Sequence, residues 1–97
     1  MDPSQKPIVE VCLENAESVI IAQETGAQRV ELCSDLFEGG LTPSLGTFRI
    51  ARHKAASIGI NVMVRPRGGD FCYSNTDFDI MLEEVKIFRE EGADAVV

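Results

Sequence analysis

The amino-acid sequence predicts an α/β fold with a parallel sheet, and two observations carry this prediction. Glycines recur every 33 residues, at Gly26, Gly59 and Gly92, and a short apolar run follows each of them within a few positions. Segments with helical spacing of apolar residues separate these runs. Because strands that alternate with helices in this way are joined by crossover connections, neighbouring strands are expected to lie parallel.

Four short apolar runs are the expected strands. They comprise residues 8–12, 29–33, 60–64 and 94–97, and their length and composition are typical of strands. The helix after the third strand has the clearest helical spacing, and its apolar positions predict one buried face. These positions are Phe78, Met81, Leu82 and Val85. The predicted element order is βαβαβαβ.

Capping signals predict where the helices begin and end. Asn15, Thr42 and Thr76 are expected to cap the N-termini of the three helices, with Pro43 at the first position of the second helix. The three periodic glycines are expected to follow the helix C-termini, where a residue in the left-handed conformation commonly ends a helix.

Two architectures fit this order, a doubly wound sheet and a barrel. The usual nucleotide signals of a doubly wound sheet are missing, since no GxGxxG follows the first strand and no GxxxxGK[ST] occurs. Glu10 and Glu31 would also be poorly placed in a sheet covered by helices on both faces. We therefore predict the N-terminal portion, about four β/α units, of a TIM-type (β/α)8 barrel, which needs roughly 250 residues when complete.

The domain prediction follows from this architecture. Residues 1–97 are expected to form a single incomplete barrel domain, with residues 1–7 as a disordered N-terminal tail. Such a chain is expected to be a fragment, a truncated product, or a half that pairs with another chain.

Composition and charge exclude several classes of partner. The formal net charge of -7 and the lack of a run of Lys and Arg argue against nucleic acid. No apolar run is long enough to cross a membrane and no export signal opens the chain, so we expect a cytoplasmic protein, with a nuclear location also open. The three cysteines show no CxxC spacing and are expected to be free thiols.

The first two strands contain matching Val-Glu-x-Cys blocks. Side chains alternate along a strand, so Glu10 shares a face with Cys12, and Glu31 shares a face with Cys33. If the register is level, the equivalent positions of the two blocks are neighbours about 4.8 Å apart. The cysteines would then lie at the C-terminal mouth of the barrel with the carboxylates beneath them. Cys12 and Cys33, with the thioether of Met63 nearby, suit Cu(I), whereas Zn²⁺ normally takes further ligands.

A basic turn follows the third strand. Arg65, Arg67, Gly68 and Gly69 are predicted to bind an anion, because an arginine fork matches a carboxylate or phosphate and glycines let backbone N–H groups approach it. Alternatively, Arg67 pairs with Asp70 and only holds the loop.

Structural alternatives stay open for the other site residues as well. Cys12 and Cys33 could be small buried apolar residues. Glu10 and Glu31 could form an interior ion pair with Arg65.

Four strings of residues together resemble the CutC copper homeostasis family. They are Val-Glu-Val-Cys at 9–12, Gly-Ala-x-Arg-Val-Glu-Leu-Cys at 26–33, Glu-Gly-Gly-Leu-Thr-Pro-Ser at 38–44 and Val-Arg-Pro-Arg-Gly-Gly-Asp-Phe at 64–71. The resemblance implies a cytoplasmic barrel of about eight strands linked to copper handling. It also implies Cys12 and Cys33 as the proposed copper ligands, and assembly into homo-oligomers, either dimers or tetramers. The sequence departs from the family in lacking everything after the fourth strand.

Two functional hypotheses follow. The first is a copper-binding protein of copper homeostasis that holds Cu(I) through Cys12 and Cys33. The second is a barrel enzyme for a small phosphate or carboxylate substrate, with Arg65 orienting the anion and Glu10 or Glu31 as general acid or base. We expect no catalysis from this fragment, because residues contributed by later strands are missing.

Overall fold

Strands and helices alternate along residues 6–97, the part of the chain that the computed structural model describes. The elements are β1 (Glu10–Leu13), α1 (Ala16–Glu24), β2 (Arg29–Leu32), the short 3₁₀ helix η1 (Leu36–Glu38), α2 (Leu45–Lys54), β3 (Gly59–Val62), α3 (Asn75–Glu90) and β4 (Ala95–Val96). The predicted order is confirmed. Of the predicted disordered tail, residues 1–5 lie outside the described residues, and Lys6 and Pro7 are exposed without regular structure.

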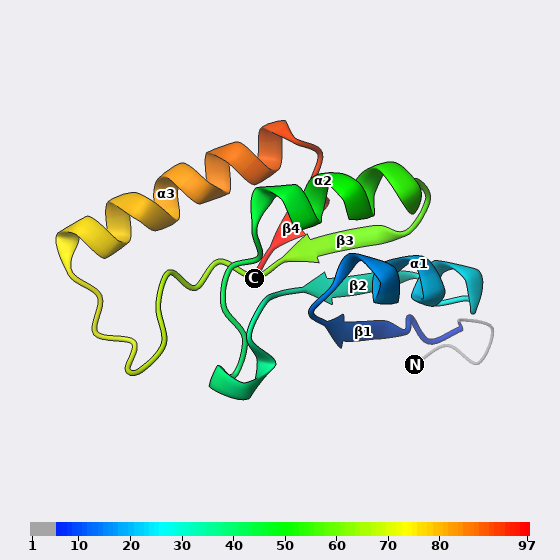
Figure 1. Ribbon diagram of the computed structural model, residues 1–97, viewed down its shortest axis with the longest axis horizontal. Helices are drawn as coiled ribbons and strands as arrows, with labels where there is room; N and C mark the ends of the chain where they lie inside the picture. Colours follow the sequence, from blue (N-terminus) through cyan, green and yellow to red (C-terminus); the bar gives the residue numbers. More distant parts are fainter. Residues whose placement is uncertain (1–5) are drawn as a thin grey trace.

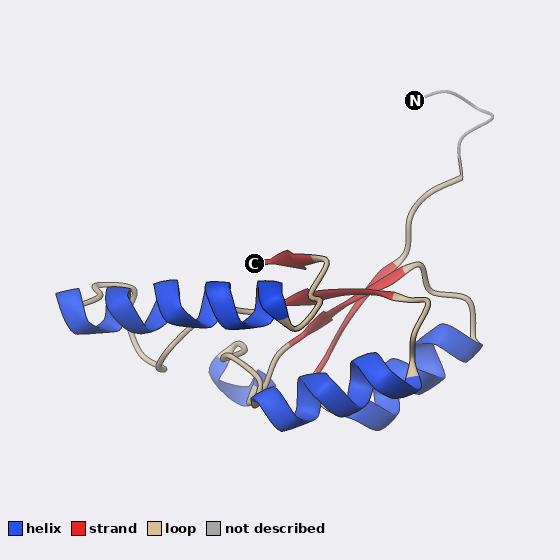
Figure 2. Cartoon of the chain, turned by 90° about the horizontal axis from the view of Figure 1, so that it is seen from above, coloured by secondary structure: helices blue, strands red, loops and turns tan. Residues whose placement is uncertain are grey.

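The four strands form one parallel sheet in the order β1-β2-β3-β4 (Figure 1). Helices α1 and α2 lie against one face of this sheet, and no helix of the described chain lies on the opposite face (Figure 2). In a (β/α)8 barrel the helices cover only the outer face, because side chains fill the interior. The predicted fold class, the N-terminal portion of a TIM-type barrel, is confirmed.

The core lies between the sheet and its helices. Alternation along β2 and β3 turns Val30, Leu32, Ile60 and Val62 to the helix side, and all four are fully buried. Helix α2 contributes Phe48, whose ring meets the ring of Phe88 from α3 edge to face at 5.4 Å between centroids. This packing fixes which face of the sheet is covered, and no helix formed by residues 6–97 covers the face that carries the cysteines.

Two of the three predicted N-caps are wrong. Asn15 caps α1 as expected, accepting a hydrogen bond from the backbone N–H of Ser18. Helix α2 is capped by Ser44 instead of Thr42, and α3 is capped by Ser74 instead of Thr76. Thr42 does not cap α2 because its hydroxyl is bonded elsewhere: it accepts from the backbone N–H of Arg65 and donates to the backbone oxygen of Arg65.

The periodic glycines do not all act alike. Gly26 and Gly92 follow α1 and α3 with φ of +97° and +98°, the left-handed conformation expected after a helix end. Gly59 instead begins β3, and a Cβ on it would lie 3.0 Å from the Cβ of Arg29. Any larger residue there would crowd β2, which passes this close.

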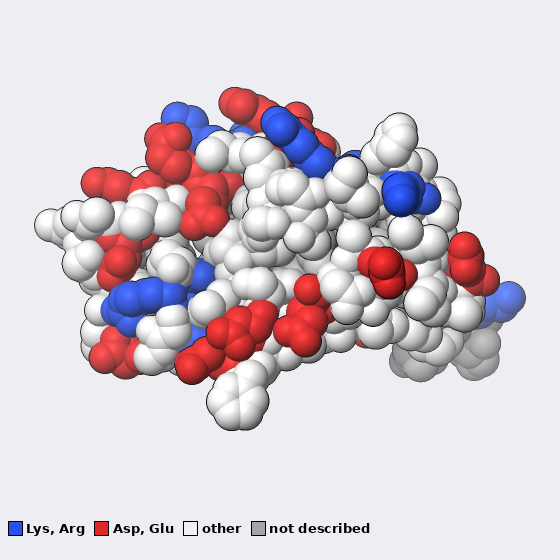
Figure 3. All heavy atoms as spheres, in the orientation of Figure 1, with Lys and Arg blue, Asp and Glu red and all other residues white. Residues whose placement is uncertain are grey.

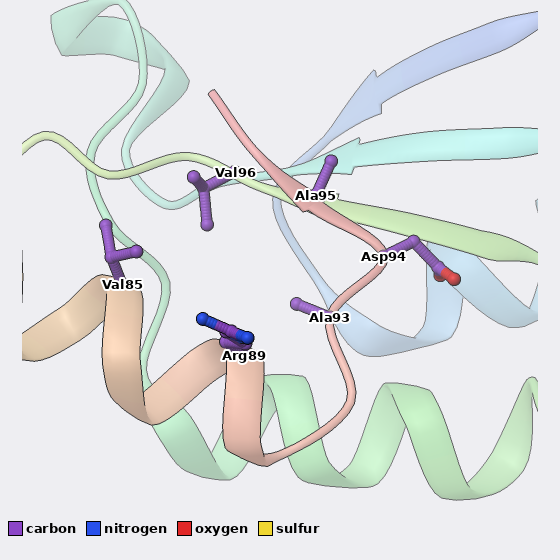
Figure 4. Close-up of a pocket in the computed structure, with 6 residues that line it drawn as sticks. All are labelled: Val85, Arg89, Ala93, Asp94, Ala95 and Val96. Carbon is purple, nitrogen blue, oxygen red and sulfur yellow. The ribbon is translucent and has the colours of Figure 1, made fainter.

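The predicted apolar face of α3 is only partly covered. Met81 and Val85 are half-buried, whereas Phe78 and Leu82 are 56% and 54% exposed. Val85 also borders a groove of about 260 Å³ between α3 and β4 (Figure 4). A second groove, of about 310 Å³, lies beside β1 and α1. Both grooves lie at the outer strands of the sheet, and neither of them is lined by a cysteine.

Acidic side chains predominate on the face shown in Figure 3 and are densest over α3, at its upper left. Helix α3 and its C-cap carry six acidic residues against two basic ones, Lys86 and Arg89. The acidic residues are Asp77, Asp79, Glu83, Glu84, Glu90 and the C-cap Glu91. No helix within residues 6–97 is long and apolar enough to cross a membrane.

Candidate metal centre

The register of β1 and β2 differs from the level alignment predicted from the two blocks. Cys12 lies opposite Glu31, so Cys33 stands two residues further along β2 than the partner of Cys12. An offset of two residues keeps both cysteines on the same face, because side chains alternate with a period of two. The cysteines are therefore diagonal neighbours, with Cys33 just beyond the end of β2 and Cys12 one level deeper.

The two thiols still meet. Cys12 Sγ and Cys33 Sγ are 3.9 Å apart, well beyond the length of a disulfide bond, and Cys33 Sγ also lies 3.4 Å from the backbone oxygen of Leu13. Cys33 is completely buried, whereas Cys12 is exposed on the open face of the sheet. One thiol is thus accessible to solvent and the other is covered.

A loop, residues 34–44, covers Cys33. Gly40 in this loop has φ of +98°, and a Cβ on it would lie 3.4 Å from Cys33 Sγ and 3.5 Å from the terminal methyl carbon of Met63. The loop is closed by the backbone pairing of Ser34 with Leu41. This close approach of Gly40 to the buried thiol is a role that the sequence pattern did not reveal.

Arg65 fastens this loop. Its guanidinium donates to Glu38 O at 2.6 Å, Gly40 O at 3.2 Å and Gly69 O at 2.9 Å, and it lies over the ring of Phe71. These bonds join the loop after β2 to the loop after β3. Arg65 therefore helps to hold Gly40 against Cys33.

Burial raises the pKa of the Cys33 thiol from its ordinary 9.0 to about 12. The neighbouring Cys12 contributes next, by charge repulsion and by hydrogen bonding, and the carboxylates of Glu31 and Glu14 add smaller repulsions. All of these effects disfavour a negative charge on Cys33. The thiol is thus protonated at neutral pH, and a metal ion would have to displace the proton.

Met63 supplies the third sulfur of this region. It follows Val62, the register partner of Leu32, and so lies beside Cys33, as the strand pattern predicted. Among residues 6–97 no group of three or more His, Cys, Asp or Glu side chains is arranged to hold a metal ion. The donor set is therefore two thiols with a thioether near them.

Glu10 has partners other than Arg65, and Glu31 stands level with Cys12, not beneath the thiols as predicted, because of the two-residue offset. Glu10 Oε1 accepts from Asn61 Nδ2 at 2.7 Å and lies 3.1 Å from Arg29 Nε. Glu31 is half-buried beside Cys12. The suggested interior ion pair with Arg65 is thus not formed by Glu10, because the register places Arg29 directly opposite it.

In the predicted anion site, the guanidinium of Arg67 forms its hydrogen bonds with other groups of the chain. Arg67 donates to Asp77, Asp70 and the backbone oxygens of Gly68, Asp70 and Cys72, in agreement with the structural alternative of a pairing with Asp70. A backbone hydrogen bond from Ser74, followed by the bond from Arg67, holds the pKa of Asp77 below its ordinary value. Anion binding by this turn stays a prediction.

The fold and the thiols together define a class of protein, a parallel α/β barrel segment with two neighbouring cysteines where its first two strands end. The chain belongs to the CutC family, whose model matches residues 7–97.

Relatives cover nearly all of this chain. A CutC family protein of Mesorhizobium japonicum is 50% identical over 91 residues, which are 94% of this chain and 35% of that protein. The copper homeostasis protein cutC homolog of Homo sapiens is 42% identical over 90 residues, 93% of this chain and 33% of that protein. The chain thus spans about a third of the length of these curated relatives.

A solved structure shows the same fold. The crystal structure of a CutC protein from Streptococcus agalactiae matches with a TM-score of 0.82 and 37% identity, over 90% of this chain and 42% of that chain.

Proposed function

We propose that this chain binds Cu(I) through Cys12 and Cys33 and serves copper homeostasis. The observation that carries the proposal is the approach of the two sulfur atoms to 3.9 Å without a bond between them. Two sulfur atoms at this distance can be bridged by one metal ion. The human relative is named a copper homeostasis protein, and this name supports copper as the metal.

The donor set favours Cu(I) over other common metals. Thiolates and thioethers are soft ligands that select Cu(I), whereas structural Zn²⁺ almost always takes four ligands from Cys, His and carboxylates. With no such larger group among residues 6–97, the two cysteines and Met63 fit a soft ion of low coordination number. Bound Cu(I) would be held for storage or transfer, and the chain itself would perform no redox step.

Exposure suggests how the two ligands differ. Cys12 is open to solvent, while Cys33 lies beneath Gly40 and is protonated at neutral pH because its pKa is about 12. Binding at Cys33 would release this proton, so the affinity for Cu(I) should rise with pH. A reducing cytoplasm, the location proposed here, would keep both thiols available.

The enzyme alternative has less support. Arg65 and Arg67 direct most of their donors to loop carbonyls and to Asp70 and Asp77, which leaves few of them for a substrate. Only Arg65 Nε is buried without a hydrogen-bond partner in the described part of the chain. Catalysis by Glu10, Glu31 or Arg65, and assembly into dimers or tetramers, stay predictions.

An anaerobic titration tests the copper proposal. The reduced chain competes with a Cu(I) chelator, and the wild type is compared with the Cys12→Ser, Cys33→Ser double variant and with Cys72→Ser as matched control. The double variant should lose competition with the chelator, while the control, which removes an exposed thiol away from the site, should keep it. Equal affinities of the double variant and the wild type would rule the proposal out.

A further inference from the structure

We propose that the two-residue offset between β1 and β2 prevents Cys12 and Cys33 from forming a disulfide with each other in the folded chain, so that oxidation stops at a mixed disulfide on Cys12. The offset is set by the pairing of Cys12 with Glu31. The inference takes its biological meaning from the proposed copper function, but it concerns the thiols alone. It assigns Cys12 as a site of reversible modification.

Disulfide geometry provides the first step. An unstrained disulfide needs an S–S distance of about 2.05 Å and Cα atoms about 4.4–6.8 Å apart. The usual strand spacing and rise place Cα atoms that are two residues out of register about 8 Å apart. The sulfur atoms reach 3.9 Å because the side chains lean toward each other, and a further approach of about 2 Å would have to move the strands.

The backbone resists that movement. Cys33 N–H donates to Leu13 O at 3.0 Å, which holds the end of β2 against the end of β1. The loop on the other side of Cys33 is fastened by the pairing of Ser34 with Leu41. Cys33 is therefore fixed from both directions.

A metal ion does not need the strands to move. With metal–sulfur bonds of about 2.3 Å, as in zinc thiolates, two sulfur atoms bound to one ion can lie up to ~4.6 Å apart. The observed 3.9 Å falls within this reach. The same offset thus permits a metal bridge and opposes a direct bond between the sulfurs.

The accessible thiol can still react with a small disulfide such as oxidised glutathione. The Cys12 thiolate attacks one sulfur, a bond forms between Cys12 Sγ and that glutathione, and the other glutathione leaves as a thiolate that takes up a proton. An intramolecular disulfide would then require Cys33 Sγ to attack Cys12 Sγ and expel the first glutathione. Burial of Cys33 and the offset oppose this second step, and added thiol reverses the first.

Oxidation of the copper-free chain tests the inference. All proteins carry Cys72→Ser, are incubated with oxidised glutathione, alkylated and mapped by mass spectrometry. The expected result is one glutathione on Cys12, an alkylated Cys33, and a yield of the linked Cys12–Cys33 peptide at least ~10-fold below that of the same protein in urea, where no strand geometry opposes the bond.

A matched control moves the second thiol into register. The Glu31→Cys, Cys33→Ser variant has the same number of thiols, but its new thiol lies directly opposite Cys12, at a strand spacing of about 4.8 Å that a disulfide accepts. It should form the linked peptide under native conditions. Native linkage of Cys12 to Cys33 as extensive as in urea, or as in this control, would overturn the inference.

This result is separate from the copper proposal. A chain that links Cys12 to Cys33 readily but binds Cu(I) when reduced contradicts only the inference on oxidation. A chain that resists linkage but shows no thiol-dependent competition for Cu(I) contradicts only the copper proposal.

Discussion

Burial of Cys33 should make the protein less stable at alkaline pH. Its pKa is raised to about 12 in the folded chain from an ordinary 9.0, so the thiol of the unfolded chain ionises first as the pH rises. The unfolded state is therefore favoured progressively from about pH 9 towards pH 12. Below pH 9 this contribution to stability is fully present.

The size of the effect follows from the shift. Between the two pKa values the free energy of unfolding falls by about 1.4 kcal/mol for each pH unit, since one pKa unit corresponds to that energy. Relative to pH 7.5, the loss from Cys33 alone should reach about 1.4 kcal/mol at pH 10.

Urea denaturation under reducing conditions at pH 7.5 and pH 10 measures this loss. Cys33→Ala removes the titrating group, whereas Cys72→Ser removes an exposed thiol and should behave as the wild type. The other groups that titrate in this range cancel in the comparison. An equal loss in the wild type and in Cys33→Ala would refute the reasoning.

Two further predictions concern the elements that position the site. Ser74→Ala should lower the free energy of unfolding by about 1 kcal/mol, because it removes the N-cap and capping box of α3. Thr76→Ala should change this free energy little, and equal losses for the two variants in urea denaturation would contradict Ser74 as the cap. Gly59→Ala should cost about 1–3 kcal/mol because its Cβ would crowd Arg29. Gly46→Ala within α2 should be neutral or stabilising, because its Cβ would make only an ordinary contact with Ser44 Oγ at 4.0 Å. A neutral Gly59→Ala in the same assay would contradict the close approach of β2.

The element order was readable from the sequence because it depends on local periodicity. The glycine interval and the alternation of strands with helices are properties of short segments, and each segment buries one face. The caps of α2 and α3 were harder to predict. Thr42 and Ser44 both have hydroxyls suited to capping, and Thr42 was excluded only by its hydrogen bonds to Arg65, 23 residues away in the sequence.

The candidate site was predicted in part. Alternation along the strands correctly put Cys12 and Cys33 on one face, because this depends only on the period of two. The role of Arg65 was not foreseen, since a basic turn looks the same in sequence whether its donors face a ligand or the carbonyls of a neighbouring loop. Gly40 gave a local signal, the Gly-Gly pair, but its contact with Cys33 depends on how that loop folds back.

The sequence by itself determined the α/β class, the parallel order of strands and the shared face of the two thiols, because all of these follow from residue periodicity within segments. Only the tertiary structure decided the register between β1 and β2. A shift of two residues leaves every side chain on its own face, so the pattern of apolar and polar residues fits both registers equally well. That offset separates two blocks of identical pattern into a buried thiol and an exposed one. It also leaves their sulfur atoms 3.9 Å apart, with no bond between them.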